Sequence, residues 1–338
     1  MDAENNKTLI IAEIGQAHDG SLGLAHSYID AVAKTKADAI KFQTHIAHAE
    51  TTIHEPWRVK FSKQDKTRYK YWERMEFSKQ QWRDLKMHAD DVGLKFMSSP
   101  FSLEAVELLK EVGVYAWKIA SGEVNNNEML DSIAETGLDI YLSTGMSTLE
   151  EIDRAVESIN KKGIPVTVLQ CTSMYPTPPE KIGLNLLNIF RERYRCGVGL
   201  SDHSGKIYPG LAAISIGINV LEVHATFSKK MFGPDVSSSL SIDELKELVN
   251  GVRFIENILC NDVDKNFLAE ELQPMRKIFR KSIVFIKDLK IGSIINRSDI
   301  GFKKPGSGVD PDHIGNVLGK TLKKAVKADD LLSMDDLI

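Results

Sequence analysis

The sequence predicts an α/β protein built as a (β/α)8 TIM barrel with a small second domain after it. Two patterns indicate the barrel. From Leu9 onward, short apolar runs rich in β-branched residues alternate with longer segments of helical period, as in parallel strands covered by helices. Eight such units are complete by about residue 260, and that number favours a closed barrel over an open doubly wound sheet, which is the alternative.

The predicted strands and helix starts follow in chain order. We expect strands at residues 9–15, 39–45, 95–101, 116–123, 140–146, 166–172, 197–203 and 220–226. Helices fill the gaps, and three of them should begin with a capping box, in which two side chains accept hydrogen bonds from free backbone N–H groups at the helix start. These boxes pair Ser78 with Gln81, Ser147 with Glu150, and Ser241 with Glu244.

The segment 46–77 interrupts this alternation. It carries several large aromatic residues, among them Trp57, Tyr69, Tyr71 and Trp72, which are unusual in a plain linker. Loops of this length are mostly functional or disordered. Because the segment follows the second strand, it should lie at the end of the barrel where active sites are found, and we interpret it as a covering loop.

The pattern of apolar runs and turn residues changes after the barrel. We place the barrel domain at 1–265, a linker at 266–280 and a second domain at 281–338, where runs are short and turns are frequent, as at Pro305-Gly306. A domain of roughly 60 residues is only marginally stable alone, so we expect it to pack on a partner surface.

The composition points to a small-molecule enzyme of the cytoplasm. Lys+Arg 43 against Asp+Glu 47 gives a formal net charge of −4, so no basic excess indicates nucleic-acid or membrane binding. Three cysteines at irregular spacing fit neither a disulfide framework nor a Cys-x-x-Cys site. No apolar run is long enough for a transmembrane helix, and no signal peptide is recognisable.

Two lysines, Lys41 and Lys118, stand inside apolar strands. Burial of an ammonium without a counter-charge costs several kcal/mol, so each requires an anion. Hydroxyls that follow the strands, at Ser99, Ser121 and Ser143, can donate to phosphate or carboxylate oxygens. The pattern predicts an anion-binding pocket, and the alternative is that each lysine extends past the barrel end into solvent.

Two histidines, His203 and His224, end consecutive strands, so their imidazoles should lie close together. The functional interpretation is a divalent metal with open coordination positions, and the structural one is a pair of hydrogen-bonded histidines. Glu13, in an otherwise apolar strand, is either a buried acid or base with a raised pKa or a salt-bridge partner of Lys41.

These residues, in this order, resemble the sialic acid synthase family, the nonulosonate synthases, over nearly the entire chain. The tail from about Ser282 looks like the antifreeze-like (SAF) domain of these enzymes. The segments that carry the resemblance are Ala12-Glu13-Ile14-Gly15 with His18, Lys41-Phe42-Gln43-Thr44, Ser99-Pro100-Phe101, Lys118-Ile119 with Ser121-Gly122-Glu123, Leu142-Ser143-Thr144-Gly145-Met146, Tyr175-Pro176, Gly199-Leu200-Ser201-Asp202-His203 and Gly233-Pro234-Asp235.

The resemblance implies a reaction and an assembly. Family enzymes condense phosphoenolpyruvate with an N-acylated hexose, use Mn²⁺ or Mg²⁺, and form a domain-swapped homodimer. The default acceptor is N-acetylmannosamine, which gives N-acetylneuraminate and phosphate. The alternatives are a 2,4-diacetamido-trideoxyhexose, which gives legionaminate or pseudaminate, and a sugar 6-phosphate, which gives a 9-phosphate product.

The resemblance also assigns roles to residues. His203 and His224 would bind the metal, and Glu13 and Glu123 would be the catalytic acids or bases. The remaining roles concern substrate binding: Lys41, Ser99, Lys118, Ser121, Ser143, Ser173 and Ser201 for phosphoenolpyruvate, and Gln43, Tyr175, Asp235 and Lys304 for the sugar.

Three positions depart from the family pattern. Ala17 stands where an asparagine is common, and Ser173 stands where some members have asparagine. Lys304 replaces an arginine that contacts the N-acyl group across the dimer, and an ammonium cannot give the forked donation of a guanidinium. The acceptor sugar is therefore the least determined part of the function.

Two other functions compete with this one. The first is a related barrel synthase that joins phosphoenolpyruvate to a phosphorylated sugar, such as the octulosonate and heptulosonate phosphate synthases, but those relatives lack the antifreeze-like tail. The second is a carbohydrate-binding or ice-binding protein with an inactive barrel. Its weakness is that such a scaffold has no use for costly buried charges at Glu13 and Lys41.

Overall fold

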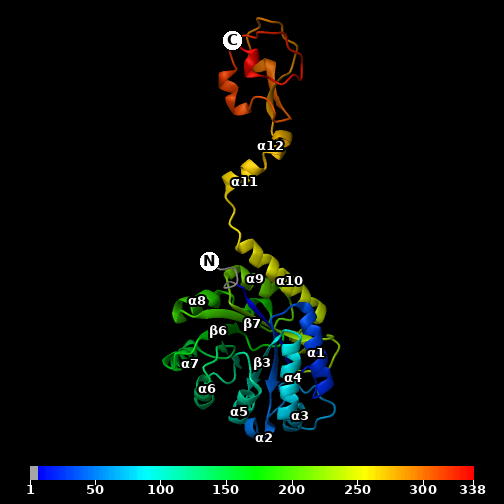
Figure 1. Cartoon of the computed structure of the whole chain (residues 1–338), viewed down its shortest axis with the longest axis vertical. Helices are drawn as coiled ribbons and strands as arrows, with labels where there is room; N and C mark the ends of the chain where they lie inside the picture. Colours follow the sequence, from blue (N-terminus) through cyan, green and yellow to red (C-terminus); the bar gives the residue numbers. More distant parts are fainter. Residues whose placement is uncertain (1–6) are drawn as a thin grey trace. The chain divides into compact units, whose positions relative to one another are not determined.

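The computed structural model describes residues 7–338, which form two compact units divided after Cys260. In the first unit, parallel strands are surrounded by helices (Figure 1). Its strands pair in chain order, and β1 also pairs with β8, so the sheet is closed and the open sheet is excluded. They are β1 Leu9–Gly15, β2 Ala39–Thr44, β3 Lys95–Pro100, β4 Trp117–Ile119, β5 Ile140–Ser143, β6 Val166–Cys171, β7 Gly197–Asp202 and β8 Val220–Thr226, with a short β9 Leu240–Ser241 beside β8.

The helices cover the outside of this barrel through apolar stripes. Helix α7, for example, buries Ile152, Ala155, Val156 and Ile159, which recur every three or four residues, and turns its charged residues outward. The helices of this unit are α1 Leu22–Thr35, α2 Ala47–Glu50, α3 Arg68–Met75, α4 Lys79–Asp91, α5 Leu103–Val112, α6 Asn127–Ala134, α7 Leu149–Lys161, α8 Asn185–Tyr194, α9 Tyr208–Ile216 and α10 Ile242–Leu259, with 3₁₀ turns η2 Pro179–Lys181 and η3 Val236–Ser238.

Two of the three predicted capping boxes are confirmed, at Ser78 with Gln81 and at Ser241 with Glu244. The box at Ser147 is wrong: the cap of α7 is Thr148, which pairs with Glu151. Ser147 is unsuited to the cap because its N–H donates to Thr144 O in the turn after β5. In sequence, Ser147 with Glu150 and Thr148 with Glu151 both fit the capping-box pattern. The turn after β5 determines that Thr148 is the cap.

The eight strands lie where they were predicted, but several end early. β4 runs over Trp117–Ile119 rather than 116–123, and β5 ends at Ser143 rather than 146. After β4 the chain folds into a turn in which Glu123 N donates to Ala120 O. The predicted strand ends therefore belong to the loops that carry polar side chains at the mouth of the barrel.

The barrel interior is layered because side chains alternate along each strand. An apolar layer is formed by Ile11, Ala39, Met97, Ala116, Tyr141, Leu169 and Val220. Two residues further along each strand, the same interior face carries Glu13, Lys41, Ser99, Lys118, Ser143, Cys171 and Glu222, all of them buried. This polar layer forms the floor of the site.

The second unit has its own small core, which includes Ile283, Phe285 and Ile300. Its elements are α11 Lys265–Glu271, α12 Gln273–Phe279, β10 Ser282–Phe285, η4 Arg297–Asp299, β11 Ile300–Lys303, η5 Pro311–Asn316 and η6 Met334–Asp336. β10 and β11 pair antiparallel. Much of the predicted linker 266–280 is helical, in α11 and α12. None of the described helices is long and apolar enough to span a membrane.

Candidate active site

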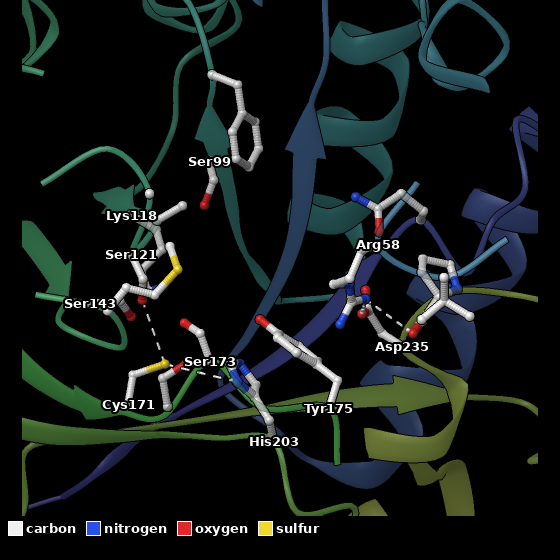
Figure 2. A pocket seen from close by; sticks show the side chains of 18 of the residues that line it. Arg58, Ser99, Lys118, Ser121, Ser143, Cys171, Ser173, Tyr175, His203 and Asp235 are labelled. Atoms are coloured by element: carbon white, nitrogen blue, oxygen red, sulfur yellow. Dashed lines mark hydrogen bonds and ion pairs between the residues drawn. The ribbon is translucent and has the colours of Figure 1, made fainter. Parts of the chain in front are cut away.

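A cavity of about 330 Å³ opens at the carboxyl ends of the barrel strands. Figure 2 shows serines and Lys118 on one side, Tyr175 and His203 below them, and Arg58 with Asp235 on the other side. The cavity brings together ten of the residues predicted from the sequence: Lys41, Ser99, Lys118, Ser121, Ser143, Ser173, Tyr175, Ser201, His203 and Asp235.

Four other predicted residues of the barrel, Glu13, Gln43, Glu123 and His224, are not among the side chains that line the cavity. Glu13 is adjacent to it through Lys41, and the β-sheet register places Glu13 opposite both Lys41 and His224. The carboxylate of Glu123 accepts from Asn126 at 3.0 Å, and burial raises its pKa. Lys304 lies in the second unit, where its ammonium is over the ring of Phe279.

The two buried lysines are held by two buried glutamates. Lys41 Nζ lies 2.5 Å from Glu13 Oε2 and 3.8 Å from Glu222 Oε2, and Lys118 Nζ lies 3.1 Å from Glu222 Oε1. The lysine side chains are only 3% and 4% exposed, which excludes their extension into solvent. Of the two interpretations of Glu13, the ion pair with Lys41 corresponds to a salt-bridge partner.

The protonation states of this cluster follow from its geometry. Burial alone would lower the pKa of Lys41, but the carboxylates of Glu13 and Glu222 outweigh it, so the pKa is raised. Burial alone would raise the pKa of Glu222, but Lys118 and Lys41 outweigh it, so the pKa is lowered. Lys41 is therefore a cation and Glu222 is a carboxylate at neutral pH.

Hydroxyl groups surround these charges. Ser99 Oγ accepts from Lys41 at 3.2 Å, and Ser201 Oγ donates to Glu222 at 2.9 Å. Ser121 Oγ accepts from the backbone N–H of Gly145 at 2.9 Å. The hydroxyl of Ser143 is buried without a protein partner, although a buried polar group normally has one. It is thus available to donate to a bound anion.

Gly145 permits the close approach of these groups. A Cβ atom at this position would collide with Ser173 Oγ and would lie 2.8 Å from both Cys171 Sγ and Ser121 Oγ. No side chain can therefore be placed there without opening the serine cluster. The glycine also leaves its N–H exposed to the hydroxyl of Ser121.

His203 and His224 lie side by side, with ring centroids 5.2 Å apart. His203 Nδ1 lies 3.1 Å from the carbonyl oxygen of Thr172, which orients the ring and leaves Nε2 available. Burial, and then the neighbouring His224, lower the pKa of His203 to about 3. A neutral imidazole with a fixed orientation is able to act as a metal ligand.

The donor set fits a divalent cation with an open coordination sphere. Among residues 7–338, no group of three or more His, Cys, Asp or Glu side chains is arranged as a metal site. A metal held by His203 and His224 would therefore take its other ligands from water and substrate, as in sites that act as Lewis acids.

The segment 46–77 contributes much of the outer wall, as its aromatic content predicted. Trp57, Phe61, Tyr71 and Trp72 line the cavity. Arg58, from the same segment, also lines it and was not predicted, because an irregular loop has no periodicity that indicates where its side chains point.

Other cavity residues, to which the sequence assigned no role, include Gln16, Arg68, Phe101, Met146, Cys171 and Glu222. For two of them, the sequence contains a pattern that predicts the direction of the side chain. Cys171 and Glu222 have the strand parity of the apolar interior residues Leu169 and Val220, so alternation along β6 and β8 points them into the barrel.

The fold, with a cavity at the carboxyl ends of the barrel strands, is typical of barrel enzymes, in which the residues at this end form the active site. The chain belongs to the NeuB family, whose model matches residues 28–264, and residues 280–338 match the SAF domain. This confirms the resemblance to the sialic acid synthases, the nonulosonate synthase family, and the predicted barrel with its C-terminal SAF domain.

Curated relatives match nearly the whole chain. The N,N'-diacetyllegionaminic acid synthase of Campylobacter jejuni is 36% identical over 332 residues, covering 96% of this chain and 99% of the relative. The human N-acetylneuraminate-9-phosphate synthase is 32% identical over 335 residues, covering 97% of this chain and 92% of the relative.

A solved structure of a sialic acid synthetase is also similar to this chain. It is the N-acetylneuraminic acid (sialic acid) synthetase of Leptospira borgpetersenii serovar Hardjo-bovis in complex with citrate, with a TM-score of 0.70 and 31% identity. The match covers 79% of this chain and 91% of that chain.

Proposed function

We propose that this protein condenses phosphoenolpyruvate with an unphosphorylated N-acylated hexose to give a nonulosonate and inorganic phosphate. One observation carries the proposal: two buried ammonium groups and the unpartnered hydroxyl of Ser143 lie in the same cavity as His203, whose ring is beside His224. Anion-binding groups and a candidate metal site therefore lie in one cavity, where a nucleophilic enol phosphate and an electrophilic aldehyde could react.

The lysines and serines would hold the phosphate and carboxylate of phosphoenolpyruvate. An ammonium has three N–H donors, and one ion pair is seen for Lys118, with Glu222. No other partner of Lys118, and none of the Ser143 hydroxyl, is found within residues 7–338, so the remaining donors can bond to substrate oxygens. The glutamates keep the empty pocket close to neutral, which makes the buried lysines tolerable before the anion binds.

His203 and His224 would hold Mn²⁺ or Mg²⁺. When bound, such an ion polarises the carbonyl oxygen of the acceptor aldehyde. The contribution of the protein is the orientation of the two rings, through Thr172 O on His203 and through Tyr175, whose ring stacks on His203 at 4.3 Å.

The reaction forms one carbon–carbon and one carbon–oxygen single bond and breaks one carbon–oxygen single bond. The C2=C3 electron pair of phosphoenolpyruvate bonds C3 to the aldehyde carbon, whose oxygen takes up a proton and becomes a hydroxyl, and a water oxygen bonds to C2. The bond between C2 and the bridging oxygen then breaks, phosphate leaves with that oxygen, and the new C2 hydroxyl loses its proton as C2 becomes a ketone. A base must take a proton from the water. Neither Glu13 nor Glu123 lines the cavity. We favour Glu13 for this role because it contacts the lining residue Lys41 and is the strand neighbour of His224, whereas the carboxylate of Glu123 bonds to Asn126.

The outer wall favours an acceptor without a phosphate. Lys41 and Lys118 are assigned to phosphoenolpyruvate. The other lysine and arginine side chains that line the cavity in the described chain are Arg58 and Arg68, which pair with Asp235 and Glu55, so the lining offers no second basic cluster for a sugar phosphate. N-acetylmannosamine is the simplest acceptor of this kind. The name of the Campylobacter relative supports a 2,4-diacetamido-trideoxyhexose as the second candidate.

The homodimer is also a proposal. Large apolar side chains are exposed on α10 of the first unit, among them Phe254, and on α11 and α12 of the second unit, among them Phe267 and Phe279. Exposed apolar surface of this kind is a candidate for an interface. A second copy of the chain is the partner that the family resemblance implies. Light scattering of the full-length protein should give twice the mass of one chain.

A phosphate-release assay tests the function. The full-length protein is incubated with phosphoenolpyruvate, Mn²⁺ and, in separate reactions, N-acetylmannosamine, its 6-phosphate and a 2,4-diacetamido-trideoxyhexose. We expect release only with sugar present, fastest with an unphosphorylated one, and abolished in His224→Ala. Release without any sugar, or unchanged release in the variant, would refute the metal-assisted condensation.

A further inference from the structure

Arg58 joins the segment 46–77 to the far side of the cavity mouth. Its Nη2 donates to Asp235 Oδ1 at 2.6 Å and to the carbonyl oxygen of Pro234 at 3.1 Å, so one nitrogen spans two acceptors in the loop after β8. Figure 2 shows the side chain of Arg58 beside Asp235 at the edge of the cavity. The contact crosses 177 residues of sequence, and it connects two loops that leave different strands.

The guanidinium also packs on Tyr175. Its central carbon lies 4.1 Å from the centre of the tyrosine ring, and the imidazole of His203 stacks on the same ring at 4.3 Å, tilted by only 21°. A ring has two faces, and neither face has room for both groups at these distances. Tyr175 is therefore held between Arg58 and His203, and a candidate metal ligand is in contact with the segment 46–77 through one aromatic ring.

Arg58 has N–H donors that its contacts with the loop after β8 do not use. A guanidinium carries five N–H bonds, and both hydrogen bonds of Arg58 within the described residues use Nη2. The N–H groups of Nε and Nη1 have no recorded protein acceptor. The side chain is 37% exposed and lines the cavity, so these donors can reach a bound molecule.

The other cavity arginine is different. Arg68 Nε pairs with Glu55 at 2.9 Å, and its guanidinium lies over Trp72 at 5.0 Å. Both of these partners belong to the segment 46–77 itself, so Arg68 stabilises the segment internally. Arg58 alone of the two bridges the segment to the loop after β8.

We propose that Arg58 determines acceptor binding: its free N–H groups donate to carbonyl or hydroxyl oxygens of the N-acylated sugar, while its stacking holds Tyr175 against His203. This rests on the proposed function and deepens it, because it assigns the acceptor end of the cavity to a residue of the same chain. Phosphoenolpyruvate binds at the lysine–serine floor and should not depend on Arg58.

The test compares Arg58→Lys and Arg58→Gln with wild type. Lysine keeps the charge but loses the forked donation and the planar stacking, and glutamine loses the charge as well. The matched control is Arg193→Lys, which alters a similar arginine–aspartate pair, with Asp153, between the outer helices α8 and α7. Steady-state kinetics are measured with the best acceptor of the phosphate-release panel, and circular dichroism checks folding.

We expect the acceptor KM to rise at least about tenfold in Arg58→Lys and further in Arg58→Gln, as befits the loss of charge-assisted hydrogen bonds. The KM for phosphoenolpyruvate should stay within about twofold, and Arg193→Lys should match wild type. An unchanged acceptor KM overturns the proposal, and so does an equal rise in both KM values, which would indicate a general structural role. If wild type itself shows no sugar-dependent phosphate release, the proposed function fails and this inference fails with it.

Discussion

Lys118 has a buried ion pair with Glu222, and we propose that it also binds phosphoenolpyruvate. Both side chains are only 4% exposed, and each would be costly to bury alone. The lysine could be predicted from the sequence because a cation in an apolar strand is unusual. The glutamate was recognisable only through strand alternation, and Arg58 was not recognisable at all, because its loop has no regular pattern.

Replacement of Lys118 by methionine should separate these roles. Without the ammonium we expect kcat/KM for phosphoenolpyruvate to fall by roughly 100-fold or more, from the loss of two charge-assisted hydrogen bonds. The free energy of unfolding should fall by about 3 kcal/mol, because buried Glu222 loses its nearest cation. These effects are measured by steady-state kinetics and urea unfolding.

The control for Lys118→Met is the double variant Lys118→Met with Glu222→Gln. It removes both charges and should recover most of the lost stability without recovering the binding of phosphoenolpyruvate. A single variant that binds phosphoenolpyruvate normally would contradict the assignment of Lys118 to the anion pocket.

The elements of the fold were predictable, whereas their ends were not. Strand and helix positions follow from apolar periodicity, which is a local property. The end of β4 at Ile119 and the cap of α7 at Thr148 depend on the turns that follow each strand. Those turns are shaped by contacts at the mouth of the barrel, such as Gly145 N with Ser121 Oγ, which no short window of sequence contains.

The structural order of the segment 46–77 should depend on the side chain of Trp72. Trp72 stacks on His45 at 3.9 Å, and its Nε1 donates to Glu55 at 2.7 Å. In Trp72→Ala we expect faster hydrogen exchange of residues 47–77 with no change in β1. Trp72→Phe, which keeps a ring but loses the donor, should be intermediate. Equal acceleration in the barrel strands, or none in the segment, would contradict this account.

The stability of the whole barrel should depend on pH through His18. The side chain is buried against Phe77, and burial, with smaller effects of His45 and Arg74, lowers its pKa from 6.5 to about 3. Below pH 6.5 the unfolded chain takes up a proton that the folded protein refuses. The contribution of the neutral ring is thus fully present above pH 6.5 and is lost as the pH falls towards 3, at up to about 1.4 kcal/mol per pH unit.

Urea unfolding at pH 7.5, 6.0 and 5.0 measures this effect. Tryptophan fluorescence reports on the first unit because all four tryptophans lie within residues 57–117. The free energy of unfolding should fall less steeply with decreasing pH in His18→Gln than in wild type or in the control His48→Gln, which alters an exposed histidine. Parallel slopes for His18→Gln and wild type would show that His18 is not held neutral by burial.

The central claim is that the cavity joins C3 of phosphoenolpyruvate to a sugar aldehyde and releases phosphate with its bridging oxygen. The most direct measurement uses phosphoenolpyruvate labelled with ¹⁸O at the oxygen between C2 and phosphorus, together with the best acceptor and Mn²⁺. Mass spectrometry of the products should find the label in inorganic phosphate. Label retained in the sugar acid, or phosphate released without a nine-carbon product, would contradict the account.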